Sequence, residues 1–218
     1  MEISDDLALM YIFGINIRVT KRLFDVISTT IITIISLPLQ AVLYLLIRIS
    51  DPGPAIYKHE CYGREGKKIF VYKFRTMYAK YSLGEKFGGR KIDDVLKQLP
   101  SEKAEEFKKT AKIKNDPRVS KLGKFLRRTS LDELPQLWSV IRGDMSFVGP
   151  RPALFNQVDL IDMRTTVGVH CLTPGITGWA QINGRDEISI QEKVKLETYY
   201  LNNKSLIFDV KIIFQTFY

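Results

Sequence analysis

A stretch of 22 residues without a charge, from Val26 to Ile47, limits what this chain can fold into more than any other feature. As a helix it is long enough to cross the roughly 30 Å hydrocarbon core of a bilayer. Its β-branched residues make a poor helix in water, but lipid favours one because the backbone must satisfy its own hydrogen bonds. Pro38 lies near the middle and removes a backbone donor. The stretch therefore predicts a membrane helix that is kinked or broken at Pro38.

Basic residues flank this stretch on both sides, and basic flanks favour the cytoplasmic side of a membrane. Crossing the bilayer would leave one basic flank outside, whereas a helix broken at Pro38 can enter the bilayer and return. We therefore favour a re-entrant helix, with a single-pass anchor and a buried helix of a soluble protein as the alternatives. The flanking residues are Arg18, Lys21, Arg22, Arg48, Lys58, Arg64, Lys67 and Lys68.

The composition points to anionic partners in a reducing compartment. Lys and Arg outnumber Asp and Glu by 33 to 24, a formal charge of +9, which suits nucleic acid, anionic lipid or phosphorylated substrates. Cys61 and Cys171 are the two cysteines, too few for a disulfide framework or a cysteine-based metal site. The first residues are acidic where a signal peptide would be basic, so none is expected.

The pattern of the chain predicts a helix-rich α+β fold in three parts. Residues 1–20 form an N-terminal extension, 21–50 the re-entrant helix, and 51–218 a small cytosolic domain. The turn Asp51-Pro52-Gly53-Pro54 opens this domain, and short alternating runs around Gly63 and Gly66 indicate a basic β-hairpin. Residues 79–117 are highly charged and predict a surface insertion, with an exposed helix that begins after Pro100.

Three further helices are expected nearer the C-terminus. Leu134, Leu137, Trp138 and Ile141 follow the spacing of one apolar helical face, and Gly143 can end that helix. Ser189 and Glu192 fit a capping box at the start of the next helix. The apolar, aromatic tail that begins at Ser205 suits either an amphipathic helix at a membrane surface or a helix packed on the core.

Two adjacent carboxylates, Asp132 and Glu133, open the helix that contains Pro135. Ser130 and Glu133 have the spacing of a capping box, and acidic residues in a first turn complement the helix dipole. Taken alone, the pair is therefore best explained as a helix cap. Its surroundings favour chemistry, because carboxylates together with phosphate oxygens are the usual environment of Mg²⁺, and an ionised aspartate can attack phosphorus.

Cations recur in the motifs around this pair. Arg151 lies between two prolines that restrict its backbone, and a guanidinium at a fixed place suits bidentate binding of phosphate. Several cations, glycine-rich turns and two carboxylates together suggest a phosphate pocket with a metal. The candidate phosphate-binding residues are Lys73, Arg75, Arg127, Arg151 and Arg185.

The order of the motifs KRLFD, DPGP, YKFRTM, NDPRVSKLGKFLRRTSLDELPQLW, GDMSFVGPRP and PGITGWAQINGR resembles the bacterial sugar transferases, the monotopic polyprenyl-phosphate phosphoglycosyl transferases. The resemblance runs from about Lys21 to the C-terminus. It implies an enzyme of the bacterial inner membrane, held in the cytoplasmic leaflet by the re-entrant helix and by interfacial amphipathic helices, without a nucleic-acid partner. Such enzymes initiate capsule, exopolysaccharide, O-antigen or glycoprotein glycan assembly.

The resemblance also implies roles for individual residues. Asp132 would attack the β-phosphate of a UDP-sugar, release UMP and hold the phosphosugar, which undecaprenyl phosphate then accepts. Mg²⁺ would be required, with Asp132 as its ligand and Glu133 as the residue that positions or activates the lipid phosphate. Arg127 and Arg151 match phosphate-binding positions, and the substrate-binding residues would include Pro150 and Arg185.

The sequence departs from the family pattern at several positions. Ser36 is separated from Pro38 by Leu37, where the family has serine directly before the proline of the kink. His59 and Cys61 replace a glutamine and an arginine, and we expect an exposed strand pair without chemistry there. Thr173 stands where an arginine is usual. The long insertion resembles hexose-1-phosphate transferases, whereas TGWAQINGR resembles enzymes for N-acetylated amino sugars, so the sugar stays open.

The sequence thus predicts a phosphoglycosyl transferase. The alternative is a non-catalytic, single-pass module whose basic face binds anionic lipid or nucleic acid. A Mg²⁺-dependent aspartyl-phosphate phosphatase fits less well, because the Asp-x-Asp-x-Thr arrangement is absent.

Overall fold

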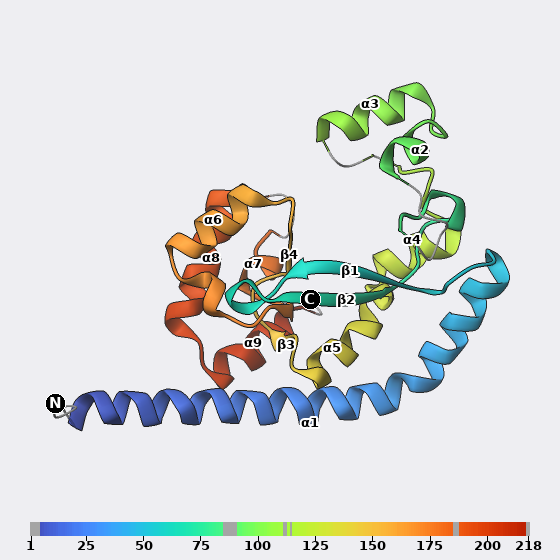
Figure 1. The fold of residues 1–218 in the computed structure, drawn as a ribbon. Helices are drawn as coiled ribbons and strands as arrows, with labels where there is room; N and C mark the ends of the chain where they lie inside the picture. The colour runs from blue at the N-terminus through green and yellow to red at the C-terminus, as the bar shows by residue number, and fades with distance from the viewer. Residues whose placement is uncertain (1–4, 85–90, 111–112, 114, 185–187, 217–218) are drawn as a thin grey trace. The chain divides into compact units, whose positions relative to one another are not determined.

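The computed structural model describes residues 5–84, 91–110, 113, 115–184 and 188–216; the side chains of 5–18 and 108–110 lie outside this description. It combines many helices with short strands, as the predicted helix-rich α+β fold requires (Figure 1). The helices are α1 (Asp5–Ser50), α2 (Ile92–Leu96), α3 (Ser101–Thr110), α4 (Lys121–Arg128), α5 (Leu137–Arg142), α6 (Val158–Thr166), α7 (Trp179–Ile182), α8 (Ile190–Asn203) and α9 (Leu206–Thr216). The strands are β1 (Ile56–Tyr62), β2 (Lys68–Phe74), β3 (Ser146–Val148), β4 (Ala153–Leu154) and β5 (Gly175–Thr177), and 3₁₀ helices are η1 (Arg64–Gly66), η2 (Ala79–Tyr81), η4 (Leu131–Gln136) and η5 (Val169–Cys171).

The chain folds into two compact units. Unit 1 comprises the described parts of 1–35, 59–71 and 136–218, and unit 2 those of 36–58 and 72–135. The long helix α1 and the strands β1 and β2 each contribute residues to both units.

Two small sheets form the β-structure. The predicted hairpin around Gly63 and Gly66 is confirmed as β1 and β2, and the order of its sheet is β2-β1-β4. Strand β4 pairs antiparallel with β1, and β3 pairs parallel with β5. Since β3 and β5 belong to the motifs GDMSFVGPRP and PGITGWAQINGR, two distant motifs meet in one sheet.

The C-terminal helices pack on the core of unit 1. Ile212 of α9 is fully buried in a cluster with Val148 and Tyr200. On the other side of α9, Ile207 and Phe214 are exposed. The tail thus packs on the core and also presents an apolar face, so the prediction of an interfacial helix stays compatible with the fold. One of the two hydrogen bonds of the predicted capping box at the start of α8 is confirmed, because the backbone N–H of Glu192 donates to Ser189 Oγ.

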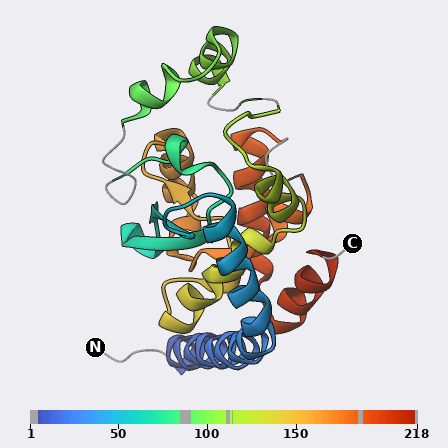
Figure 2. The same cartoon turned by 90° about the vertical axis from the view of Figure 1, so that its right-hand side faces the viewer.

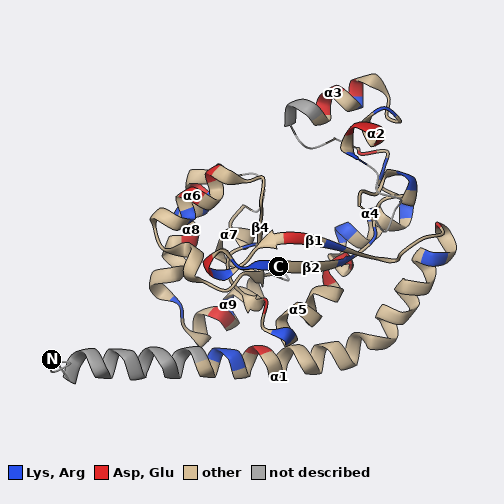
Figure 3. Cartoon of the chain, viewed as in Figure 1, with Lys and Arg blue, Asp and Glu red and all other residues tan. Residues whose placement is uncertain are grey.

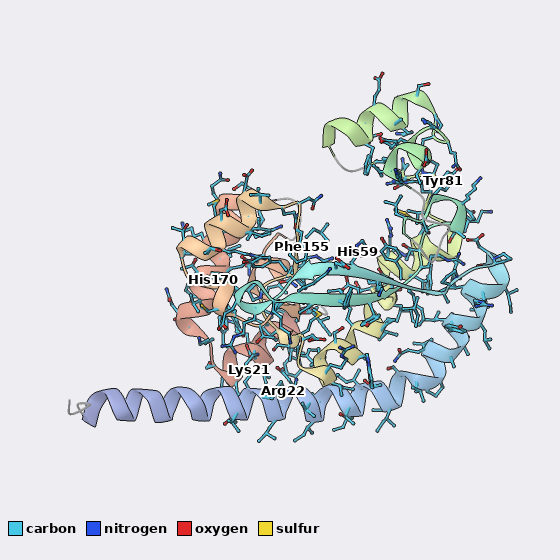
Figure 4. All side chains as sticks on the ribbon, viewed as in Figure 1. Lys21, Arg22, His59, Tyr81, Phe155 and His170 are labelled. Carbon is cyan, nitrogen blue, oxygen red and sulfur yellow. The ribbon has the colours of Figure 1, made fainter. Side chains whose placement is uncertain are left out.

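Helix α1 is attached to unit 1 through polar side chains that point away from its apolar face. Lys21 Nζ donates to Asp209 Oδ2 of α9 at 2.5 Å, and these helices lie side by side in Figures 1 and 2. Arg22 donates to the carbonyl oxygens at the end of α5. Figure 4 shows Lys21 and Arg22 on this side of the helix. Asp25 accepts from Ser146 Oγ at 2.7 Å. The KRLFD motif therefore anchors the helix.

Beyond this motif, α1 remains one helix through Pro38, so the proline does not end it. Gln40 Nε2 donates to Ser36 Oγ at 2.9 Å, which gives Ser36 a side-chain partner one turn away. Between Val19 and Ser50 the helix is long and apolar enough to cross a membrane, with a mean hydropathy of 2.2 in its most apolar window. Figure 3 shows the long uncharged stretch. The re-entrant course of the helix stays a prediction.

Unit 2 has its own apolar core. Leu43 and Ile47 from the end of α1 pack with Phe74 of β2 and Leu126 of α4. Helix α4 approaches the chain after β2 closely at Gly123, where an added Cβ would lie 1.9 Å from the Thr76 carbonyl oxygen. This close approach fixes α4 on the YKFRTM segment.

The charged insertion contains the predicted helix after Pro100, which is α3. It also buries Val95, Leu96 and Leu99, so it is more than a solvated surface segment. Arg118, from the motif NDPRV, forms an ion pair with Asp116 and lies 4.8 Å from the centre of the Phe107 ring of α3. A cation–π contact thus ties the insertion to that motif.

The helix after the carboxylate pair ends at Gly143, as predicted, with Gly143 at φ 90°. Its predicted apolar face is wrong at Trp138, which is 56% exposed. Leu134 lies in the 3₁₀ helix Leu131–Gln136, whereas Leu137, Trp138 and Ile141 lie in α5, so the four residues do not share one α-helical period.

Removing the cation at Lys21 tests the attachment of α1. Lys21→Met leaves the buried Asp209 carboxylate without that partner, so we expect the free energy of unfolding to fall by about 2–4 kcal/mol at neutral pH. Denaturation of the detergent-solubilised chain measures it, with the exposed Lys195→Met as control.

Acid should reduce the effect of this substitution. Burial raises the pKa of Asp209, against the opposing effect of Lys21. Below that pKa the carboxyl is neutral and no longer needs the cation, so the difference between Lys21→Met and wild type should shrink as the pH falls. A difference that stays constant with pH would contradict the ion pair.

Candidate active site

The carboxylate pair lies at the start of a helical segment, as the sequence predicts. Helix α4 ends at Arg128, and Ser130 reverses the chain with φ at +55° before η4 begins. The backbone N–H of Glu133 donates to the Ser130 carbonyl oxygen at 3.1 Å, which closes a turn through the backbone. The carboxylate of Glu133 is engaged elsewhere, so the pair has another role than a simple capping box.

Lys73 of β2 reaches Glu133 across 60 residues of sequence, with 2.6 Å between its Nζ and Glu133 Oε1. Both side chains are partly buried, at 22% and 17% exposure. Partial burial strengthens the attraction compared with a pair in free solvent. Lys73 therefore holds Glu133 in place beside Asp132.

Asp132 is the more buried of the two carboxylates, at 9% exposure. Burial raises the pKa of Asp132; the charge of Lys73 opposes this rise, that of Glu133 adds to it and that of Arg127 opposes it again. The arrangement is a partly desolvated carboxylate next to two cations and a second carboxylate. Desolvation makes a carboxylate more reactive, and the two cations favour its charged form.

Arg127 projects from the last turn of α4 toward the chain after β2. Its Nε donates to Thr76 Oγ1 at 2.9 Å, a contact that the close approach at Gly123 makes possible. The motifs YKFRTM and KLGKFLRRTSLDE thus form one cluster in unit 2, which contains Lys73, Thr76, Arg127, Asp132 and Glu133. The sequence did not predict that Thr76 belongs to this cluster. Its position directly after Arg75 in the motif YKFRTM could have indicated it.

The donor set of this cluster suits Mg²⁺ only with help from a substrate. Among the residues that the structure describes, no group of three or more metal-binding side chains occurs. Glu133 is paired with Lys73, so Asp132 is the better placed ligand. Mg²⁺ is commonly held by one or two carboxylates together with substrate phosphates. The cluster fits that pattern.

Arg75, a predicted phosphate-binding residue, lies in a different environment. Its guanidinium is 2% exposed and forms an ion pair with Asp51 at 3.1 Å, and it also donates to the Ile47 carbonyl oxygen. Asp51 Oδ2 also accepts from the backbone N–H of Ala79 at 2.6 Å. Arg75 thus joins the end of α1 to the segment after β2. Its role in phosphate binding stays a prediction.

Arg151 and Pro150 lie in unit 1 on a turn supported by the second glycine-rich motif. The N–H of Gly149 donates to Thr177, and that of Gly175 to Pro150, both at 2.9 Å. A Cβ at Gly175 would lie 2.1 Å from the nitrogen of Gly149, so only glycine allows this approach. The exposed Arg151 lines a small hollow. Arg185 lies outside the described residues.

The residues that depart from the family pattern, His59, Cys61 and Thr173, lie in different surroundings. Cys61 is buried with Ile69 and Val71, so the prediction of an exposed pair is wrong for Cys61, whose side chain faces the core of unit 1. His59 is half-buried on β1. Thr173 lines a surface cavity of about 520 Å³.

Comparisons with known proteins point to sugar transferases. The family model described as "Bacterial sugar transferase" matches residues 16–218. The "UDP-galactose-lipid carrier transferase" of Erwinia amylovora is 39% identical over 201 residues, which cover 91% of this chain and 40% of that protein. The "UDP-glucose:undecaprenyl-phosphate glucose-1-phosphate transferase" of Escherichia coli strain K12 is 39% identical over 210 residues, with 93% and 40% covered. The "Exopolysaccharide production protein ExoY" of Rhizobium meliloti is 37% identical over 196 residues, with 90% and 83% covered. The chain thus spans about two fifths of the length of the first two relatives and most of the third.

The close approach at Gly123 can be tested by adding one methyl group. Gly123→Ala should push α4 away from Thr76, remove the Arg127–Thr76 bond and lower the free energy of unfolding by about 1–3 kcal/mol. Denaturation measures the loss. The control is Lys124→Ala at the neighbouring, exposed position of α4, which should leave stability within about 0.5 kcal/mol.

Proposed function

The chain belongs to the bacterial sugar transferase family, and on that premise we propose that it transfers a sugar 1-phosphate from a UDP-sugar to a polyprenyl phosphate such as undecaprenyl phosphate. The products are UMP and a polyprenyl-diphosphate sugar. The observation that carries the proposal is the cluster of Asp132, Glu133, Lys73 and Arg127 in a chain whose relatives bear the names of such transferases. The reaction would begin the assembly of an exopolysaccharide, capsule, O-antigen or protein-linked glycan.

The transfer proceeds by two displacements at one phosphorus, with Asp132 as the nucleophile of the first and the leaving group of the second. Its carboxylate attacks the β-phosphorus of the UDP-sugar, the bond from that phosphorus to the bridging oxygen breaks, and UMP leaves with this oxygen. The phosphosugar is then held on Asp132 as an acyl phosphate. An oxygen of the lipid phosphate attacks the same phosphorus, and the carboxylate leaves unchanged. Splitting the transfer lets UMP depart before the second anion binds.

The cations around Asp132 lower the repulsion between its carboxylate and the phosphates. Lys73 and Arg127 provide positive charge in a partly desolvated site, where such charge has a larger effect than in water. Glu133, fixed by Lys73, is placed to orient the lipid phosphate. Mg²⁺, when held by Asp132 and the substrate phosphates, would neutralise charge on the diphosphate.

The flanks of α1 support a monotopic arrangement. Basic residues stand on both sides of the uncharged stretch, and such flanks favour the cytoplasmic side of a membrane. Within unit 1, Lys21 and Asp25 bind Asp209 and Ser146, which holds the first part of the helix against the protein. We place the enzyme on the inner face of the bacterial cell membrane.

UMP release is the direct test of the reaction. Purified chain in detergent should release UMP with Mg²⁺, undecaprenyl phosphate and one member of a panel of UDP-hexoses and UDP-N-acetyl amino sugars. Asp132→Asn should lower the rate at least about a thousandfold, and a chelator should abolish it until Mg²⁺ is restored. The exposed Asp162→Asn on α6 is the matched control. Full activity of Asp132→Asn would exclude the aspartyl mechanism, and folded protein that releases no UMP with any donor would favour the non-catalytic alternative.

The pH dependence of the rate distinguishes two roles for Lys73. Because Lys73 lowers the pKa of Asp132, Lys73→Met should raise that pKa further and leave less carboxylate ionised at a given pH. The acid limb of the pH–rate profile should then move to higher pH, whereas Lys73→Arg should retain it. A uniform loss at all pH values would instead indicate that Lys73 acts only on substrate phosphate.

A further inference from the structure

An aromatic pair stands directly after the Pro150-Arg151-Pro152 turn in unit 1. The chain leaves this turn as β4, which pairs with β1 so that Tyr62 lies opposite Ala153. Two residues on, the ring of Phe155 meets that of Tyr62, with 5.8 Å between centroids and an angle of 68° between planes. This edge-to-face contact is a favourable geometry for two aromatic rings.

Both rings are held in place by their neighbours. The backbone N–H of Leu154 donates to Gln157 Oε1 at 3.0 Å, and the N–H of Gln157 donates back to the Leu154 carbonyl oxygen at 2.9 Å. Phe155 therefore sits within a closed turn. On the other side of Tyr62, the hairpin turn packs so closely that a Cβ at Gly66 would lie 3.0 Å from the Tyr62 hydroxyl.

Phe155 nevertheless remains 44% exposed, and Figure 4 shows its position after β4. A large apolar ring that is fixed by its neighbours but left open to solvent is prepared to stack on a flat ligand, since little conformational freedom is lost on binding. Bases stack on such rings without regard to their identity, because every base has a π-face.

The neighbouring groups fit a nucleotide. Tyr62, Pro150 and Arg151 line one hollow, whose volume of about 20 Å³ admits a single water molecule, so a base would lie on the ring of Phe155 and not inside the hollow. Phe155 lies four positions after Arg151, so at most roughly 13 Å of extended chain joins them. That upper limit leaves both residues within reach of one nucleotide.

We propose that Phe155, supported by Tyr62, is the platform on which the base of the nucleotide donor stacks while Arg151 binds its phosphate. The inference rests on the proposed function and names residues of unit 1 that bind the nucleotide of its donor. The platform supplies affinity for the donor and for the product UMP, while the identity of the base is selected elsewhere.

The exposed Leu154 and Val158 beside Phe155 suggest the competing occupant, an apolar lipid chain. The two ligands can be separated because they enter the reaction in different steps. Stacking of a base affects the KM for the UDP-sugar and the binding of UMP. A lipid contact affects the KM for undecaprenyl phosphate.

The test compares Phe155→Leu with Phe155→Trp in the full-length chain in detergent. Phe155→Leu should weaken UMP binding, measured by calorimetry, and raise the KM for the UDP-sugar about tenfold each. The KM for undecaprenyl phosphate should change less than about twofold, and Phe155→Trp should bind UMP like the wild type. Phe125→Leu is the matched control, because Phe125 is likewise exposed, at 45%, and does not belong to the Tyr62–Phe155 pair.

Three results would overturn the platform: wild-type protein that does not bind UMP, UMP binding by Phe155→Leu within twofold of wild type, or an effect confined to undecaprenyl phosphate. Wild-type protein that binds UMP but releases none from any donor would refute the proposed transfer. The loss of UMP binding in Phe155→Leu would then still support the nucleotide platform, so the two failures can be told apart.

Discussion

The attachment of a mostly apolar helix through a few buried polar groups underlies the architecture of unit 1. Asp209 is 1% exposed and is stabilised by Lys21 of α1 and by the hydroxyl of Tyr200, which donates at 2.6 Å. A carboxylate removed from water is costly unless it is paired and hydrogen-bonded, so this site holds α1, α8 and α9 together. Asp25 and Arg22 repeat the principle at β3 and α5, where their partners are backbone or hydroxyl groups. In the part of α1 that belongs to unit 1, Lys21, Arg22 and Asp25 bind protein groups, whereas Leu23, Ile27 and Ile31 are exposed. This arrangement suits a helix that borders lipid.

A second constraint is the close approach of backbones at glycine. Gly123 brings α4 against Thr76, and Gly149 and Gly175 join the turn of Arg151 to β5. Each contact excludes a side chain, and each supports an arginine of the candidate site. These glycines therefore act by positioning a cation.

The candidate centre balances desolvation against charge. Burial raises the pKa of Asp132, and Lys73 and Arg127 keep its ionised form within reach. Lys73 forms its close ion pair with Glu133, so Asp132 retains oxygen atoms for a metal or for phosphorus. In the proposed reaction the two adjacent carboxylates thus have different roles, although their positions in the sequence alone do not distinguish them.

The sequence by itself determined the features that depend on local pattern. The uncharged helix, the hairpin around Gly63, the start of α8 at Ser189 and the end of α5 at Gly143 follow from periodicity, turn residues and capping, which act over a few positions. The order of motifs likewise identified the family. Only the tertiary structure decided which charges meet, because those partners come from segments far apart in the chain. It paired Lys73 with Glu133 and turned Arg75 toward Asp51, and it buried Cys61, since pairing and burial are set by the packing of distant segments and not by neighbours in sequence.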